Sequence, residues 1–61
     1  MLNLLSLEEA ARELRISIHT IRSWNFQKRF PTVKLGRRVL IKREDLERFV
    51  NENVIEARER A

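Results

Sequence analysis

One stretch of the sequence, Ser17–Trp24, carries side chains suited to hydrogen bonding with an acceptor-rich surface. Ser17 is a favourable N-cap, so a short helix is predicted to begin there. Ile21 and Trp24 lie three positions apart and predict the buried face of that helix. The outward face then carries His19, Arg22, Ser23 and, one turn further, Phe26. These residues offer donors and no carboxylate, which suits the major groove of DNA, although solvated side chains on any amphipathic helix give a similar pattern.

Basic residues dominate the middle of the chain. From Arg15 to Arg43 there is no Asp or Glu, whereas from Glu44 to Ala61 six acidic residues stand against three arginines. The basic residues of the first stretch are Arg15, Arg22, Lys28, Arg29, Lys34, Arg37, Arg38, Lys42 and Arg43. Solvated surfaces usually mix the two signs, so nucleic acid is the favoured partner. A membrane surface is disfavoured because these cations do not follow one face of a single helix.

Other classes of protein find little support in the residue inventory. The 61 residues include one histidine and no cysteine, and no base–nucleophile pair is evident, so we expect no enzyme and no cofactor. No second ligand is suitably spaced from His19, so no metal site is expected. The sequence also lacks a membrane span and a signal peptide, which favours a cytoplasmic protein, nucleoid-associated and of prokaryotic or phage type.

The elements that position Ser17–Trp24 are predicted from local signals. Ser6-Leu-Glu-Glu9 is a capping box, which predicts a helix from there to about Leu14. The short turn Arg15–Ser17 then leads into the second helix, which should end around Gln27–Arg29 because Pro31 disfavours helix at the preceding residue. Two short helices joined so tightly, with the small Ala11 where they cross, predict a helix-turn-helix unit.

A two-stranded hairpin is predicted after the helices. Residues 32–35 alternate in polarity and residues 38–41 do so less strictly, and Gly36-Arg37 provides a two-residue turn between them. The side predicted to be buried comprises Val33, Leu35, Val39 and Ile41. Such a hairpin is marginal alone, so it should lean on the helices as a wing. Phe30 and Trp24 are predicted in the core. Phe26 is predicted to pack under the wing, with contact to a partner as the alternative.

A third helix should start near Lys42–Arg43, with acidic residues in its first turn. Its predicted core face is Leu46, Phe49 and Val50. The stripe continues at helical spacing through Asn53, Val54, Ala57 and Ala61. We therefore expect one domain over residues 1–61, with a core over about 5–50 and a helical extension over 51–61 that either frays or contacts a neighbour.

The order of these features resembles the excisionase-type DNA-binding domains, small relatives of the MerR winged helix-turn-helix family. The most specific segments are T-I-R-S-W within Ser17–Trp24 and L-G-R-R ending at Arg38. The resemblance implies a mostly α fold with two short helices, a two-stranded wing and a C-terminal helix. It places DNA contacts on the second helix at Ser17, Ile18, His19, Thr20, Arg22 and Ser23, and on the wing at Lys34, Arg37 and Arg38. Arg15 and Lys28 stand where the family commonly has glycine.

Three functions follow as expectations. The first is sequence-specific binding of double-stranded DNA as an excisionase, or recombination directionality factor, with a recombinase or further copies of the chain as partners. The second is a small MerR-like transcriptional regulator. The third, of another class, is a protein-interaction module that uses the C-terminal helix.

Overall fold

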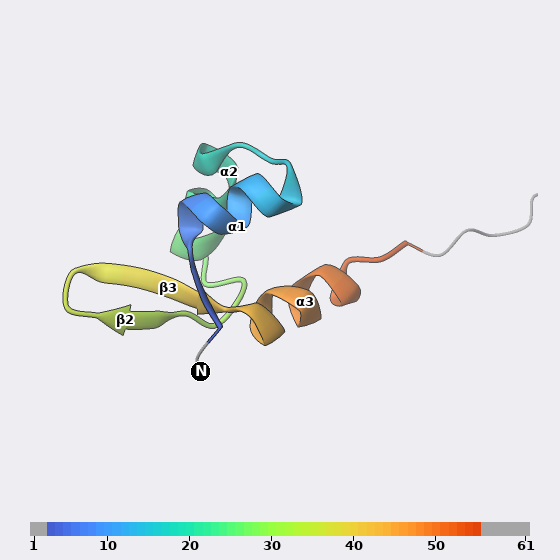
Figure 1. Cartoon of the computed structure of the whole chain (residues 1–61). Coiled ribbons are helices and arrows are strands. Elements are labelled where there is room, and N and C mark those ends of the chain that lie inside the picture. Colours follow the sequence, from blue (N-terminus) through green and yellow to red (C-terminus); the bar gives the residue numbers. More distant parts are fainter. Residues whose placement is uncertain (1–2, 56–61) are drawn as a thin grey trace, which may run out of the picture.

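The computed structural model describes residues 3–55, which form three helices and three strands around a small core (Figure 1). In chain order the elements are β1 (Leu4–Ser6), α1 (Leu7–Leu14), α2 (Ile18–Phe26), β2 (Val33–Leu35), β3 (Arg38–Lys42) and α3 (Arg43–Glu52). In Figure 1 the two short helices lie together above the sheet, and the β2–β3 turn and α3 project to opposite sides. The predicted winged helix-turn-helix architecture is confirmed.

The predicted capping box starts α1. The Ser6 hydroxyl accepts from the Glu9 backbone N–H at 3.0 Å, and the Glu9 carboxylate accepts from the Ser6 N–H at 2.8 Å. Two backbone donors at the start of the helix are thereby satisfied by side chains adjacent in sequence. Ala10 and Ala11 are buried, and these small side chains let α2 approach α1 closely.

The turn between the two helices depends on a left-handed residue. Arg15 has φ 60° and ψ 40°, and the next N–H, that of Ile16, donates to the Ala11 carbonyl at 3.0 Å. A non-glycine residue in this conformation costs roughly 1–2 kcal/mol. Ser17 then caps α2, because its hydroxyl accepts from the His19 N–H at 3.0 Å.

The end of α2 differs slightly from the prediction. The helix stops at Phe26, one residue before the range in which we expected its end. Lys28 adopts a second left-handed conformation, with φ 57°. Its N–H donates to the Asn25 carbonyl at 2.9 Å, and the Arg29 N–H donates to the Trp24 carbonyl at 3.0 Å. These bonds terminate the helix before Pro31 can.

The sheet has three antiparallel strands in the order β1-β3-β2, so the two-stranded prediction missed the strand before α1. Leu5 of β1 lies opposite Ile41 of β3, and both side chains are buried. The third strand escaped prediction because it is only three residues long and pairs with residues far along the chain.

The prediction that Val33 and Leu35 share a buried face with Ile41 is wrong, because of the register in which the strands pair. The two-residue turn pairs Leu35 with Arg38, and therefore Val33 with Leu40 and Lys34 with Val39. Partners opposite each other share a face of the sheet, so Val33 and Leu35 lie on the face away from Ile41. Leu35 is 54% exposed as a result.

The core draws on the three helices, on β1 and β3, and on the α2–β2 loop. Its buried residues are Leu5, Ala10, Ala11, Ile21, Phe30, Ile41 and Leu46. Beside them an aromatic cluster joins α2, the α2–β2 loop and α3, since the Phe49 ring lies 5.4 Å from the ring of Trp24 and 5.2 Å from that of Phe30. Phe30 is buried as predicted, and Trp24 is half-buried and packs against the core.

The helix α3 starts at the predicted position and ends earlier than its apolar stripe suggested. Leu46 is buried, but Val50 is exposed, and α3 ends at Glu52 with Asn53 as its C-cap. Val54, expected to continue the helix, lies beyond its end and is exposed. The reason is that the end of α3, after Phe49, projects past the sheet, and residues 50–55 are exposed (Figure 1). Ala57 and Ala61 lie outside the described residues.

Candidate nucleic-acid interface

The outward face of α2 is a continuous exposed stripe. His19, Arg22, Ser23 and Phe26 recur at positions i, i+3, i+4 and i+7, and all four are exposed. Phe26 is 88% exposed, so the prediction that it packs under the wing is wrong. Its spacing from His19 is two helical turns, which keeps the ring on the outward face while Ile21 is buried on the other.

The other positions proposed for the second helix differ in accessibility. Ser17 is exposed, whereas Ile18 and Thr20 are half-buried and Ile18 packs against the core. The Ser23 hydroxyl accepts from the Gln27 side-chain amide at 3.2 Å, so its own hydrogen remains a donor. Of the sequence-predicted set on α2, the exposed polar members are thus Ser17, His19, Arg22 and Ser23.

Arg22 has one carboxylate in its neighbourhood, and it comes from α1. Its Nη2 lies 3.7 Å from Oε2 of Glu8, and the two side chains are 59% and 69% exposed. An ion pair this long and this exposed contributes little to stability. The guanidinium can therefore exchange Glu8 for another acceptor.

The wing projects its cations around the hairpin end. Gly36 has φ 62° at the first position of the two-residue turn, which is where a type II′ turn requires glycine. Arg37 follows in the turn, and the register places Lys34 and Arg38 on opposite faces of the hairpin. All three cations are exposed and surround the hairpin tip, which extends beyond the helices (Figure 1).

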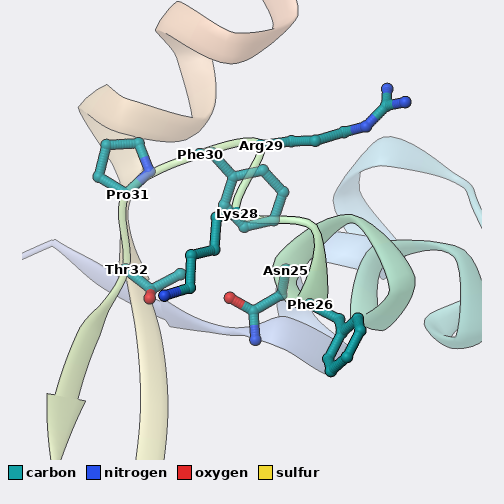
Figure 2. A pocket seen from close by; sticks show the side chains of 7 residues that line it. All are labelled: Asn25, Phe26, Lys28, Arg29, Phe30, Pro31 and Thr32. Atoms are coloured by element: carbon teal, nitrogen blue, oxygen red, sulfur yellow. The ribbon is translucent and has the colours of Figure 1, made fainter.

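A groove at the end of α2, called here the Lys28 groove, was not anticipated from the sequence. It has a volume of about 770 Å³ and is lined by Asn25, Phe26, Lys28, Arg29, Phe30, Pro31 and Thr32. Figure 2 shows the ammonium group of Lys28, the hydroxyl of Thr32 and the amide of Asn25 turned toward the same space, while the Arg29 side chain extends away. The signal that could have found it is Lys28 itself, which stands at a position where the resemblance to excisionase-type domains leads one to expect glycine.

Comparison with known families identifies this arrangement. The family model described as a helix-turn-helix domain matches residues 4–54, which cover both short helices, the wing and α3. The chain belongs to the helix-turn-helix domain family. This family comprises DNA-binding domains, including excisionase-like ones. No curated protein and no solved structure matched the chain.

One cation of the basic stretch of this helix-turn-helix domain has an internal role. Arg43 donates from Nη1 and Nη2 to the two carboxylate oxygens of Glu13, at 2.9 and 2.8 Å. These hydrogen bonds lower the pKa of Glu13 and raise that of Arg43. Arg43 therefore ties α3 to α1, whereas the cations of the wing and the Lys28 groove face solvent.

Metal and membrane sites find no support in the described part of this helix-turn-helix domain. Over residues 3–55 no three metal-ligating side chains come together. Within that same range no helix is long and apolar enough to cross a bilayer.

Proposed function

We propose that this helix-turn-helix domain binds duplex DNA sequence-specifically, with α2 in the major groove and the β2–β3 wing against the adjacent backbone or minor groove. The observation that carries the proposal is the exposed face of α2, which combines a guanidinium, an imidazole and hydroxyls and contains no carboxylate. The surrounding sequence extends this preference for acceptors, since no acidic residue occurs between Arg15 and Arg43.

The exposed side chains suggest a division of roles. We assign Arg22 to a base edge, because a guanidinium pairs bidentately with guanine in the major groove. His19, Ser17 and Ser23 supply further donors along the same helix, and Ile18 and Thr20 lie at its half-buried flank. Lys34, Arg37 and Arg38 are assigned to phosphates, which position the domain without reading sequence.

The biological role that we favour is that of an excisionase-type architectural protein, which would steer a recombinase by its placement on DNA. This assignment rests on the resemblance of Ser17–Trp24 and the wing to excisionase-type domains. A small MerR-like transcriptional regulator is the alternative, and both roles use the same DNA-binding surface.

A second surface favours contact with another protein. Val50, Val54 and Ile55 are 40%, 59% and 93% exposed at and beyond the end of α3. Apolar side chains clustered at the end of a helix that nothing described covers suit a protein neighbour, either a second copy on adjacent DNA or a recombinase.

Selection of bound sites from random duplexes, followed by footprinting, tests the proposal. A defined sequence motif is expected, and footprints in direct repeat favour the architectural role whereas an inverted repeat favours a dimeric regulator. An Arg22→Ala variant serves as the control, because it should enrich a weaker motif. Recovery of no motif by the wild-type protein would contradict sequence-specific binding.

A further inference from the structure

The Lys28 groove has the chemistry of an anion site on the DNA-facing side of the molecule. Three side chains with hydrogen-bond donors line it: the ammonium of Lys28, the amide of Asn25 and the hydroxyl of Thr32. Figure 2 shows the Lys28 ammonium beside the Thr32 hydroxyl, with the Asn25 side chain across the groove and its amide oxygen toward Lys28. Rotation of this terminal amide turns its NH2 group into the groove. No carboxylate is among the lining residues, so an anion placed there meets donors and no like charge.

The backbone at Lys28 supports a role for its side chain. The residue adopts φ 57°, a conformation that glycine takes without cost and that other residues adopt with strain. Two hydrogen bonds hold the segment in place, from the Lys28 N–H to Asn25 and from the Arg29 N–H to Trp24. Helices commonly end on a left-handed residue, most often glycine, and here that position carries a lysine whose side chain lines the groove.

The groove directly continues the proposed DNA-contacting stripe. Asn25 and Phe26 belong to the last turn of α2, and Lys28 follows one residue after its C-cap. A helix lying in the major groove has the phosphate backbone beside its end, within reach of the loop that follows.

We propose that, with α2 docked on duplex DNA as above (the placement on which this inference rests), the Lys28 groove receives one backbone phosphate. The Lys28 ammonium pairs with the phosphate charge, and the Asn25 amide and Thr32 hydroxyl donate to its oxygens. Phe26, exposed beside them, packs against the neighbouring deoxyribose. The ligand is therefore a phosphodiester of the bound duplex, and the contact fixes the register of α2 without reading a base.

A neutral-phosphate scan tests the assignment. Each phosphate of the selected duplex is replaced in turn by an uncharged methylphosphonate, and dissociation constants are measured for wild type and for Lys28→Gly. Wild type is expected to lose roughly tenfold in affinity at one phosphate flanking the α2 footprint, at about 0.1 M salt, because one fewer counterion is released. Lys28→Gly should bind unmodified DNA more weakly by a similar factor, and a methylphosphonate at that phosphate should not weaken its binding further.

The control is Arg15→Gly, which removes the same charge and the same kind of backbone strain at the other left-handed position. It should remain as sensitive as wild type at the phosphate that Lys28→Gly no longer senses. If a thermal-unfolding measurement shows that Lys28→Gly does not fold, Lys28→Met takes its place, since methionine keeps an aliphatic side chain without the ammonium.

Two results overturn the inference. Unchanged affinity of the Lys28 variants, or an unchanged phosphate profile, would show that the groove binds no phosphate while sequence-specific binding stands. Failure of the wild-type protein to bind any duplex would refute the proposed function, and this inference with it.

Discussion

Arg43 and Glu13 form a two-bonded ion pair that joins the end of α1 to the first residue of α3. The guanidinium and carboxylate meet at 2.9 and 2.8 Å although the residues lie 30 positions apart in sequence. The side chains are 41% and 44% exposed, so water screens the attraction, while the two hydrogen bonds make the pair geometrically specific. This contact joins α1 of the helix-turn-helix unit to the helix that we assign to protein contact.

Acid should weaken the fold through this pair. Hydrogen bonds from Arg43 hold the pKa of Glu13 below its ordinary value in the folded state. The stabilisation is therefore present above the unfolded pKa of glutamate and is lost as the pH falls through the folded value. Glu13→Gln should lower the melting temperature at neutral pH and reduce its dependence on acid. Glu8→Gln is the matched control, because its contact with Arg22 is longer and more exposed, and an equal effect of both variants would contradict the assignment.

Binding to duplex DNA should depend steeply on salt. If about five phosphates are neutralised, the slope of about −0.9 per contact gives a loss of several hundred-fold between about 50 and 200 mM salt. Fluorescence anisotropy with a labelled duplex measures this directly. An affinity that barely changes over the range would contradict the polyanion-binding surface.

Substitutions on α2 and on the wing should have different signatures. Arg22→Ala should weaken the selected site by roughly 1–3 kcal/mol and relax its sequence preference, because a base edge loses its donors. Arg37→Ala or Arg38→Ala should weaken all sequences alike and reduce the salt slope by about one. Titrations on selected and scrambled duplexes separate the two effects. Equal loss of discrimination from α2 and wing substitutions would mean that the roles are assigned wrongly.

Arg15→Gly should stabilise the protein. It relieves a left-handed strain of roughly 1–2 kcal/mol and adds about 0.5–1 kcal/mol of chain entropy in the unfolded state, which leaves a gain of about 0.5–1 kcal/mol. Urea unfolding measures the gain. Gly36→Ala should instead destabilise the protein. No atom lies within 4 Å of the added methyl group, but alanine is strained at the φ of 62° that Gly36 adopts. Destabilisation by Arg15→Gly would show that the Arg15 side chain contributes to folding.

Removal of residues 54–61 should separate DNA binding from protein contact. The helix α3 ends at Glu52, and the Asn53 side chain donates to the Phe49 carbonyl at 2.8 Å, so a chain that ends at Asn53 keeps its last helical cap. Binding to a single site is expected to persist, whereas cooperativity on two adjacent sites, or recruitment of a recombinase, should be lost. Gel-shift titrations on one-site and two-site duplexes measure both. Unchanged cooperativity would remove the case for a protein-contact surface there.

The local features of this protein were predictable because each is decided within about four residues. The Ser6–Glu9 capping box, the Ser17 cap and the Gly36 turn use backbone and side-chain groups adjacent in sequence, and all three occur as predicted. The resemblance to excisionase-type domains marked Arg15 as a residue at a position that commonly holds glycine, and Arg15 does adopt a left-handed conformation. The outward position of His19 and Arg22 followed from the helical repeat alone.

Tertiary structure decided the features that depend on partners distant in sequence. The strand β1 exists because Leu5 finds Ile41, and the Glu13–Arg43 pair spans 30 residues. The hairpin register follows in principle from the two-residue turn. It pairs Val33 with Leu40 and so puts Val33 on the face opposite Ile41, whereas the apolar pattern suggested that the two side chains share one buried face. The apolar pattern shows only that the Val50 side chain can be buried. Its burial requires another element to cover it, and α3 extends past the sheet at this point, so Val50 stays exposed.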